Sequence, residues 1–172
     1  MTHAVVIGAG PAGLMAAEEM ARGGLSVTVA EAKPSPARKF LMAGKSGLNL
    51  TKEEPFEAFI AAYGEAAPHL RPMLEAFGPQ DVVGWAEGLG QEMFTGTTGR
   101  VFPRAMKASP LLRAWLARLD GLGVTLQRRW RWTGWTDNAL SFETPEGRTE
   151  LQPVITILAC GGASWARLGS DG

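Results

Sequence analysis

The hydrophobic positions in the first 31 residues fall into two short apolar runs separated by a longer helical stretch. Residues 4–7 and residues 27–30 are the two apolar runs, and the stretch from Leu14 to Arg22 continues as a helix. Strand, helix and strand in this order predict a βαβ unit with two parallel strands. The segment between the first strand and the helix is rich in glycine, which indicates a tight turn.

Three helical segments are predicted between residues 54 and 90, where apolar residues recur at helical spacing and proline and glycine separate the pieces. The prolines and glycines between residues 32 and 51 argue against regular structure there. A short stretch rich in glycine and threonine at residues 92–103 predicts a small hairpin. We therefore expect one domain over residues 1–172 that carries a helical insert at about 53–104.

A further amphipathic helix is predicted to begin at Ser109, with Ser109 as its N-cap and Pro110 in the first helical position. Its apolar face consists of Leu111, Leu112, Trp115, Leu116 and Leu119. Gly121 and Gly123 follow this face and mark the end of the helix.

The remaining residues read as short strands. Residues 124–126 predict a strand, and the chain continues to Leu151 as a β-meander with turns at 133–134, 137–138 and 145–147. Residues 154–159 form a continuous apolar run, which is typical of a buried parallel strand. The order of these elements predicts a Rossmann-like α/β domain whose mainly parallel sheet carries a meander and a helical insert.

The glycine-rich turn has the spacing of a dinucleotide-binding motif. Gly8, Gly10 and Gly13 give G-x-G-x-x-G between the first strand and the helix, and Pro11 and Ala12 complete the turn. In such motifs the first glycine permits the tight turn, the second lets the backbone approach a pyrophosphate, and the third lets the helix pack on the strand. The N–H groups and the dipole of the helix start favour a phosphate there. A purely structural βαβ turn is the alternative interpretation.

Glu31 stands at the end of the second strand, 18 residues after Gly13, near the roughly 20 expected for a ribose-binding acid. Its carboxylate would accept hydrogen bonds from both ribose hydroxyls of an adenosine and would repel a 2′-phosphate, which favours FAD or NAD over NADP. Gly161 and Gly162 follow the last apolar run. They are expected at the carboxyl ends of the parallel strands, beside the glycine-rich turn, as a second cofactor contact.

A second loop contains candidate phosphate or flavin contacts. Gly44, Lys45, Gly47 and Asn49 lie in a segment that resembles a nest of backbone donors with polar side chains. A solvated surface loop is the alternative, and composition alone favours it. Metal-ligand spacing is not seen, because His3 and His69 are isolated and Cys160 is the sole cysteine. Cys160 is expected to be a small buried residue, and no side chain is identified as a catalyst.

The amino-acid composition argues against some classes of binding partner. Lys plus Arg and Asp plus Glu both number 17, so the net charge is zero and offers no basic excess for nucleic acid. Arg and Trp alternate at residues 128–135, which fits a strand with Trp130 and Trp132 on one face better than a nucleic-acid site. No apolar run reaches membrane-spanning length, and the N-terminus lacks the pattern of a signal peptide. With one cysteine, these features favour a cytoplasmic protein that binds a small molecule.

Several segments resemble a known family. V-V-I-G-A-G-P-A-G-L-M-A-A with V-T-V-A-E resembles the flavoproteins with two dinucleotide-binding domains. K-F-L-M-A-G-K-S-G-L-N-L-T, G-R-V-F-P-R-A-M-K-A-S-P-L-L-R-A-W-L and L-A-C-G-G-A-S-W-A-R-L-G-S-D-G resemble the bacterial NAD(P)/FAD-dependent oxidoreductases related to BaiN and to the aminoacetone-oxidase-like proteins. Within this group, the chain most resembles an uncharacterised flavoprotein branch.

The resemblance implies FAD, with its pyrophosphate at residues 8–13 and its AMP ribose on Glu31. It implies that residues 38–51 lie along the flavin half of the cofactor, that the backbone near Trp132 meets adenine, and that Gly161 and Gly162 contact FAD. From that segment, the site residues implied are Arg38, Lys39, Gly44, Lys45, Gly47 and Asn49. Many relatives read G-G-G-R-C-N-L-T at residues 44–51, so no substrate or redox role is carried over from that arginine and cysteine.

Members of the group continue well beyond this length, so the resemblance implies the N-terminal part of a flavoprotein, without its substrate domain and its C-terminal flavin motif. The expected function is the FAD-binding part of a flavin-dependent oxidoreductase that acts on a small organic substrate, with a nicotinamide nucleotide as a possible electron donor. Two alternatives remain open, an NAD-dependent dehydrogenase fragment and a non-catalytic nucleotide-binding or interaction module. The sequence leaves the substrate, the electron acceptor, the catalytic residues and the oligomeric state unassigned.

Overall fold

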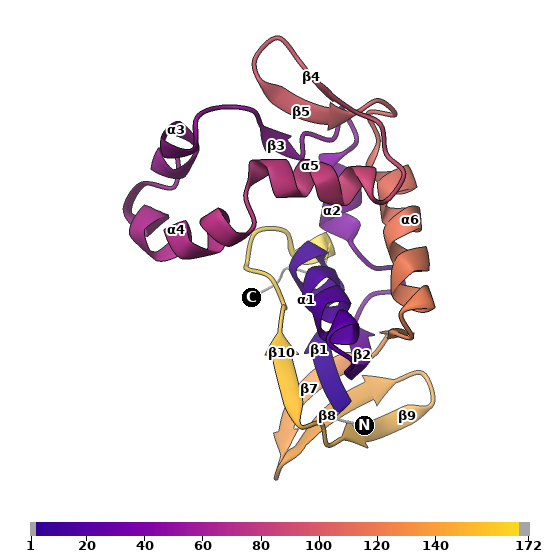
Figure 1. The fold of residues 1–172 in the computed structure, drawn as a ribbon. Helices are drawn as coiled ribbons and strands as arrows, with labels where there is room; N and C mark the ends of the chain where they lie inside the picture. The colour runs from indigo at the N-terminus through magenta and orange to yellow at the C-terminus, as the bar shows by residue number, and fades with distance from the viewer. Residues whose placement is uncertain (1–2, 169–172) are drawn as a thin grey trace. The chain divides into compact units, whose positions relative to one another are not determined.

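The computed structural model describes residues 3–168, so the last residues of the family-like segment, 169–172, lie outside the described part. The chain divides into two compact units, one made of residues 1–42 and 116–172 and the other of residues 43–115. The division falls within two helices, α2 (Arg38–Ala43) and α6 (Ala108–Gly121). Figure 1 labels the elements of both units.

A four-stranded parallel sheet forms the centre of the first unit. Its strands, in spatial order, are β10 (Ile155–Leu158), β1 (His3–Ile7), β2 (Ser26–Glu31) and β6 (Thr125–Arg128). Helix α1 (Pro11–Arg22) connects β1 to β2, which confirms the predicted βαβ unit. Ile7 is in register with both Ala30 and Leu158, so the carboxyl ends of these three strands share one edge of the sheet.

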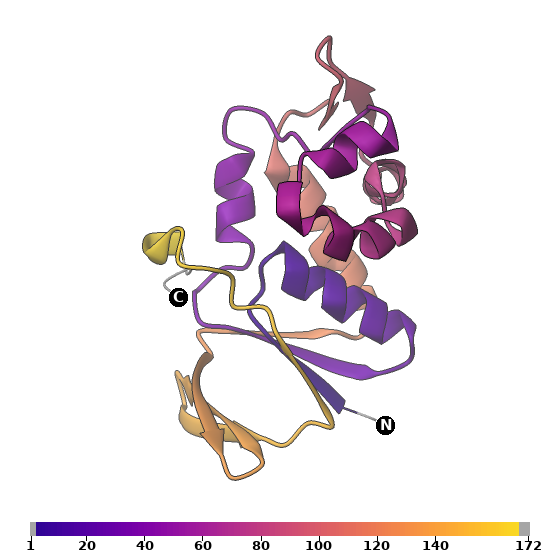
Figure 2. The ribbon, with the colours of Figure 1, turned by 90° about the vertical axis from the view of Figure 1, so that its left-hand side faces the viewer.

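Helix α1 and an antiparallel meander lie on opposite faces of this sheet (Figure 2). The meander consists of β7 (Arg131–Thr136), β8 (Ala139–Thr144) and β9 (Gly147–Leu151). Leu140 and Phe142 of β8 are buried against a sheet cluster of Val5, Ile7 and Ala30, and Trp130 and Trp132 pack against the same cluster. This contact seals one face of the sheet and confirms the predicted Rossmann-like α/β domain with a meander.

Two expectations for the first unit are wrong. Residues 133–134 do not form a turn, because β7 continues through them with a β-bulge and the positive φ of Gly134, 125°, bends the strand without ending it. The last apolar run is parallel but not buried, because β10 is an edge strand of the described sheet, where Val154 and Leu158 are 78% and 57% exposed. A 3-10 helix at Ala166–Leu168 follows β10.

A small antiparallel sheet and three helices build the second unit. The sheet has the order β3 (Thr51–Lys52), β5 (Arg100–Pro103) and β4 (Met93–Thr95). The helices are α3 (Phe56–Ala61), α4 (Ala67–Ala76) and α5 (Pro79–Glu87), with a 3-10 helix at Gly64–Ala66 before α4. The three helical segments and the hairpin predicted for this region are confirmed.

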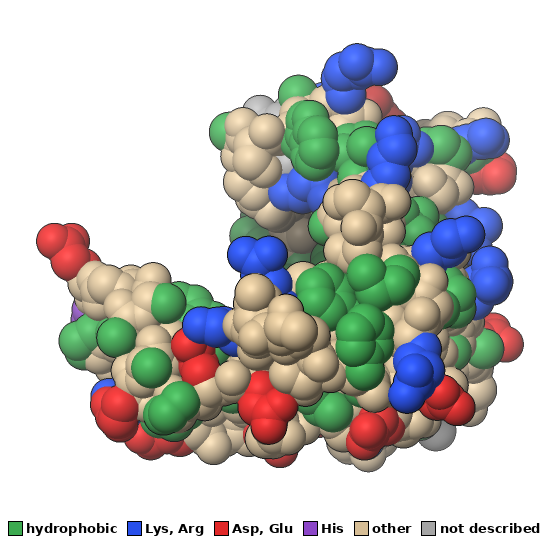
Figure 3. All heavy atoms as spheres, turned by 90° about the horizontal axis from the view of Figure 1, so that it is seen from above, with side chains coloured by type: hydrophobic (Ala, Val, Ile, Leu, Met, Phe, Trp, Pro, Cys, Tyr) green, Lys and Arg blue, Asp and Glu red, His purple; other side chains and the backbone are tan. Residues whose placement is uncertain are grey.

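The segment that contains α3 and α4 exposes hydrophobic side chains, within the helices and directly after them. Tyr63, Met73 and Phe77 are between 41% and 65% exposed. In Figure 3, green hydrophobic side chains lie among red carboxylates on the lobe at the left, which contains α3 and α4. The apolar pattern that predicted these helices therefore includes positions outside the core of the unit.

Two helix boundaries differ from expectation. The segment around Arg38 was expected to be irregular, but α2 begins there, because the prolines lie before it and the left-handed backbone of Ala37 (φ 52°) ends the irregular stretch. Helix α6 begins at Ala108 instead of after Ser109, so Ser109 is a helical residue and not the N-cap. A Cβ at Gly44 would lie 2.6 Å from the Cβ of Ala108, so the missing side chain of Gly44 lets the first turn of α6 approach the loop.

A buried carboxylate links α1 to the second half of α6. Glu18 is 1% exposed, and its Oε1 lies 2.6 Å from Nη2 of Arg22 and 3.1 Å from Nη1 of Arg118. Breaking a fully buried pair costs about 3–5 kcal/mol, because a charge is left without compensation. Here the side chain of Arg22 is 50% exposed and that of Arg118 is 21% exposed, so water compensates part of that loss.

We expect Glu18→Ala to lower the free energy of unfolding by about 2 kcal/mol. Urea denaturation of both proteins would measure this difference. The neighbouring Glu19 is exposed on the same helix, so Glu19→Ala serves as the control and is expected to change stability by less than about 0.5 kcal/mol. Equal effects of the two substitutions would show that the pairs of Glu18 do not stabilise the fold.

Candidate functional site

The candidate site lies at the carboxyl edge of the parallel sheet, around the end of β1. The N–H of Gly8 donates to the carbonyl of Ala30 at 2.8 Å, and the N–H of Ala159 donates to the carbonyl of Ile7 at 2.8 Å. Helix α1 leads from β1 to β2 on one side, whereas β10 on the other side comes from a distant part of the chain. Open α/β sheets bind ligands outside the strand ends at this kind of reversal.

The turn after β1 needs glycine at two positions for reasons internal to the protein. Gly8 has a φ of 103°, and a Cβ there would lie 2.9 Å from the carbonyl carbon of Ala159. A Cβ on Gly13 would overlap the carbonyl oxygen of Gly8 and would lie 3.2 Å from the Cβ of Ala159. Gly8 and Gly13 therefore allow β1, α1 and the end of β10 to meet.

At position 10, no contact within the protein requires a glycine. Its φ of −78° and ψ of 177° are open to any residue, and a Cβ built on it would meet nothing within 4 Å. The same open space surrounds a Cβ on Gly162. Gly10 immediately precedes α1, where the first N–H groups, including those of Ala12 and Gly13, have no intrahelical acceptor. A ligand that approaches the backbone closely would explain a glycine at this position.

Glu31 is held in place at the end of β2 by backbone donors. Its Oε2 accepts a hydrogen bond from the N–H of Ala9 at 3.0 Å, and its Oε1 accepts one from the N–H of Lys33 at 2.8 Å. Each carboxylate oxygen has two acceptor positions, so both keep one for a ligand hydroxyl. The glycine-rich turn and the acid are thus one hydrogen-bonded assembly, a link that the sequence spacing alone does not reveal.

The segment after β2 returns to the glycine-rich turn and presents cations there. The N–H of Ala37 donates to the carbonyl of Ala9 at 2.8 Å, which fixes the start of α2 beside the turn. Arg38 has one hydrogen bond, a long one of 3.4 Å from Nη1 to Ser35 Oγ, and its buried Nε has no acceptor among the described residues. A guanidinium with unused donors at this position suits an anionic ligand. The next cation, Lys39, donates to Ser164 Oγ at 3.2 Å.

Trp132 lies near this edge but is directed into the core. The N–H of Trp130 donates to the carbonyl of Glu31 at 2.9 Å, so the start of the meander is tied to the acid. The ring of Trp132 packs against the cluster between sheet and meander, and its buried Nε1 has no acceptor within the described part of the chain. A cofactor contact from this residue would therefore use its backbone.

Cys160 and the two glycines after β10 complete the edge. Cys160 is exposed, so the prediction of a buried cysteine is wrong, and the reason is that it follows an edge strand. Its thiol points back at the carbonyl of Ile7, 3.9 Å away. Partial burial raises the pKa of the Cys160 thiol, and the negative charge of Glu31 raises it further. Gly161 adopts a left-handed backbone with a φ of 77°.

We expect the thiol of Cys160 to react slowly with iodoacetamide at neutral pH, because only the thiolate is nucleophilic and the pKa is raised. The rate should increase as the pH rises through that pKa. Glu31→Gln removes a negative charge near the thiol, so it should lower the pKa and increase the rate at a fixed pH near 8. Mass spectrometry of the single cysteine gives the rate directly. Identical pH profiles for the two proteins would contradict a charge interaction between Glu31 and Cys160.

The loop residues assigned by resemblance belong to the second unit, where they have roles of their own. Gly44 makes room for Ala108, and Gly47 has a φ of 130°. The side-chain amide of Asn49, oriented by its neighbours, donates to the carbonyl of Thr51 at 2.8 Å and to that of Val101 at 3.3 Å. Lys45 is exposed. The cradle in the first unit therefore contains Gly8 to Gly13, Glu31, Arg38, Lys39, Gly161 and Gly162.

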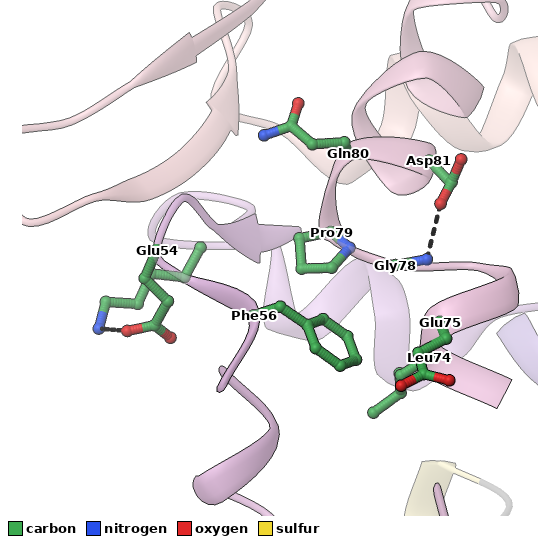
Figure 4. A pocket seen from close by; sticks show the side chains of 9 residues that line it. Glu54, Phe56, Leu74, Glu75, Gly78, Pro79, Gln80 and Asp81 are labelled. Atoms are coloured by element: carbon green, nitrogen blue, oxygen red, sulfur yellow. Dashed lines mark hydrogen bonds and ion pairs between the residues drawn. The ribbon is translucent and has the colours of Figure 1, made fainter. Parts of the chain in front are cut away.

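The second unit also contains a cavity of about 330 Å³ that no sequence motif predicted. Figure 4 shows the ring of Phe56 between Pro79 and Leu74 at its centre. The carboxylates at its rim have structural partners. Glu54 pairs with Lys52, and Asp81 accepts the N–H of Gly78 at 2.8 Å, which caps α5. These charges are engaged in holding the unit together, so they do not identify a ligand.

Neither a metal-binding cluster nor a membrane-spanning helix is found within residues 3–168. No group of three or more His, Cys, Asp or Glu side chains in this stretch is placed to hold a metal ion. None of the helices in the same stretch is both long and apolar enough to cross a membrane. The candidate site therefore consists of the glycine-rich turn, the fixed carboxylate of Glu31 and the cations Arg38 and Lys39.

Solved structures share this fold at low sequence identity. The chain aligns over 97% of its length with 60% of the THI4 protein of Thermovibrio ammonificans, at 16% identity and a TM-score of 0.58. It aligns over 94% of its length with 46% of a 3-ketosteroid-Δ4-(5α)-dehydrogenase of Rhodococcus jostii, at 16% identity and a TM-score of 0.68. For a flavocytochrome c3 fumarate reductase, the values are 94% and 34% coverage, 19% identity and a TM-score of 0.68.

The chain therefore spans between 34% and 60% of the length of these three structures. Comparison with curated proteins found no match. A family model for the HI0933-like protein Rossmann domain matches residues 2–172, which is nearly the whole chain. Together with the parallel sheet and its glycine-rich turn, this match shows that the chain belongs to the HI0933-like Rossmann-domain family.

Proposed function

We propose that this chain is the FAD-binding part of a flavin-dependent oxidoreductase that acts on a small organic substrate. The observation that carries the proposal is the open position at Gly10. The backbone and the neighbours of Gly10 would accept a side chain, so the glycine is best explained by a ligand that occupies the space in front of α1. The adjacent helix N-terminus favours a phosphate in that space.

The residues around Gly10 fit the ADP half of FAD. The first turn of α1 would hold the pyrophosphate, with Arg38 as a counter-ion whose Nε has no acceptor among the described residues. Glu31, fixed by the N–H groups of Ala9 and Lys33, would accept hydrogen bonds from the ribose hydroxyls. The same carboxylate disfavours a 2′-phosphate at this position, which supports FAD or NAD over NADP.

The choice of FAD rests on resemblance as well as geometry. The motifs after the first βαβ unit resemble the oxidoreductases related to BaiN and to the aminoacetone-oxidase-like proteins, and we propose membership in that group. One protein with a similar fold is named a flavocytochrome and another a dehydrogenase. A bound flavin would accept a hydride or electrons, and the protein would hold the flavin in position. We propose that the hydride or electrons come from the substrate or from a nicotinamide nucleotide.

The remaining site assignments follow from the same proposal. The loop with Gly44, Lys45, Gly47 and Asn49 would line the flavin half, the backbone near Trp132 would face adenine, and Gly161 and Gly162 would contact the cofactor from β10. A small-molecule substrate and a cytoplasmic location, without a nucleic-acid or membrane partner, stay predictions from composition. No catalytic residue is assigned.

The first test is the visible spectrum of the purified 172-residue chain, followed by denaturation and identification of any released cofactor. We expect a yellow protein that releases FAD, or a colourless protein that becomes yellow when FAD is added. Release of NAD in place of FAD would support the dehydrogenase alternative. A protein that takes up neither nucleotide would contradict the proposal if ADP also fails to bind.

Binding of ADP can be measured through the alkylation rate of Cys160. Because its thiol lies beside the end of β1 and near Glu31, ADP bound at the cradle should slow its alkylation. The comparison needs only the first unit, so it separates a missing flavin contact from a missing nucleotide site. Protection by ADP without uptake of FAD would favour the non-catalytic nucleotide-binding module, whereas alkylation at the same rate with and without ADP would argue against the cradle itself.

A further inference from the structure

Helix α4 presents an apolar face that the described part of the chain leaves largely uncovered. Leu70, Met73, Leu74 and Phe77 recur at the spacing that places side chains on one side of a helix. All ten residues of α4 belong to the described part, and none of them is buried. Met73 and Phe77 are 65% and 43% exposed. So short a helix, with Pro72 in its interior, is marginal without packing, and exposed apolar surface of this kind is typical of a binding face.

The apolar face of α4 continues into the cavity of about 330 Å³ in the same unit. Leu74 belongs to both the face and the cavity lining, and Figure 4 shows the ring of Phe56 between Leu74 and Pro79. A cavity of this size accommodates a large aliphatic or aromatic side chain, and the strongest contacts of protein interfaces are anchors of this kind in desolvated pockets. The surface therefore offers a helical apolar face with an adjoining pocket.

The helical lobe, residues 52–87, carries a surplus of negative charge around this surface. It contains seven carboxylates and two cations, Lys52 and Arg71, whereas the net charge of the whole chain is zero. Both cations are engaged inside the lobe, because Lys52 pairs with Glu54, and Nη2 of Arg71 lies 2.7 Å from Oε2 of Glu57. In Figure 3, the red carboxylates of the lobe lie among its green hydrophobic side chains. The apolar face is therefore set in a surface whose net charge is negative.

The charge of the helical lobe discriminates among the partners that could cover its apolar face. A nucleic acid and the anionic surface of a membrane both carry negative charge, so the lobe would repel them. In a symmetric dimer built on this face, two lobes of the same charge would meet, because such an interface joins the same patch of both copies. A helix with one apolar and one basic face is attracted both by the apolar residues and by the carboxylates.

From this arrangement we propose that the helical lobe binds a basic amphipathic helix of another polypeptide. The apolar residues of that helix would pack along Leu70, Met73 and Phe77, and one large side chain would enter the cavity beside Phe56 and Leu74. Its lysines and arginines would face the surplus carboxylates of the lobe, which would orient the helix and speed its association. The lobe lies in the second unit, so this interaction does not require the cofactor cradle of the first.

The test is a titration of a fluorescently labelled synthetic helix, with a leucine face and a lysine face, with the full 172-residue chain, followed by fluorescence anisotropy. The same peptide with glutamate in place of lysine measures apolar attraction without charge attraction. We expect the lysine peptide to bind saturably, at least about tenfold more tightly than the glutamate peptide, with an affinity that falls as salt is added. Met73→Ser on the apolar face and Glu75→Lys at the cavity should each weaken its binding at least about tenfold.

The matched controls lie in the first unit, where Val154→Ser removes an exposed apolar side chain and Glu146→Lys reverses an exposed charge. Both controls should leave the affinity for the lysine peptide unchanged. Met73 and Glu75 are more than half exposed, and circular dichroism would verify that their variants fold. The proposal is overturned if the lysine peptide does not bind, if the glutamate peptide binds equally well, or if the test and control variants bind alike. It is also overturned if sedimentation shows a dimer of the chain that Met73→Ser abolishes, because a second copy would then occupy the face.

Discussion

Gly10→Ala is expected to weaken FAD binding at least about a hundredfold, or about 2.7 kcal/mol, while the protein stays folded. The added methyl group would occupy the space before α1, where nothing in the protein lies within 4 Å and where the pyrophosphate would lie. Fluorescence titration with FAD measures the affinity, and urea denaturation measures the stability. Tight FAD binding by this variant would show that the open space at Gly10 is not the cofactor cradle.

The stability of the Gly10→Ala variant should remain within about 1 kcal/mol of wild type, because two small effects oppose each other. Gly10 is the N-cap of α1, and alanine is a poorer N-cap than glycine. Alanine also restricts the unfolded chain, which stabilises the fold by about 0.4–1 kcal/mol where the native φ is compatible. The backbone angles of Gly10 meet that condition.

The matched control is the same chemical change at Gly84, which lies exposed inside α5 with open space around its Cβ position. Gly84→Ala should leave FAD affinity unchanged and should stabilise the protein by about 0.5–1 kcal/mol through helix propensity. If Gly84→Ala lowered FAD affinity as much as Gly10→Ala does, the loss at Gly10 would reflect a general effect of the substitution.

Gly13→Ala, unlike Gly10→Ala, is expected to destabilise the fold, with a loss of about 3 kcal/mol or more in the free energy of unfolding. The new Cβ would overlap the carbonyl oxygen of Gly8 and would approach Ala159. Both obstacles are backbone or short side chain, so they cannot move aside as a flexible side chain would. The clash would force α1 away from β1 and from the end of β10.

Urea denaturation of the Gly13→Ala variant measures this loss, with Gly10→Ala as the comparison in the same turn. FAD binding should weaken too, because the displaced helix no longer directs its N–H groups at the cradle. If the Gly13→Ala variant had wild-type stability, α1 would have to pack on β1 less closely than the short distances around Gly13 indicate. Comparison of the two variants therefore distinguishes Gly13, which is required for packing, from Gly10, which is required for a ligand, although both are glycines of the same motif.

Local sequence pattern predicted the parts of the fold whose contacts lie within one βαβ unit. The apolar runs around Val5 and Val29 read as strands, and both are buried. Gly8, Gly13 and Glu31 were placed by spacing. In the structure, hydrogen bonds from Gly8 to Ala30 and from Ala9 to Glu31 join the turn to the end of β2. This worked because strand, turn and helix propensities act over a few residues and agree with each other here.

Contacts between residues far apart in the sequence determined the features that the local sequence pattern did not predict. The apolar run of β10 looks buried, but its position at the sheet edge leaves Leu158 and Cys160 exposed. The glycine at position 44 looks like part of a ligand loop, yet it serves contact with Ala108, which is far along the chain. In both cases, the deciding neighbour is absent from the local sequence.

The amino-acid sequence by itself therefore determined the Rossmann-like class, the glycine-rich turn and the acid that follows it, since these depend on periodicity and spacing. Only the tertiary structure showed that Gly10 is open whereas Gly8 and Gly13 are not, and that Thr133 and Gly134 form a bulge beside Ser141. The physical reason is that the space around a side chain is set by whichever segments pack there, and residues distant in sequence supply most of those segments.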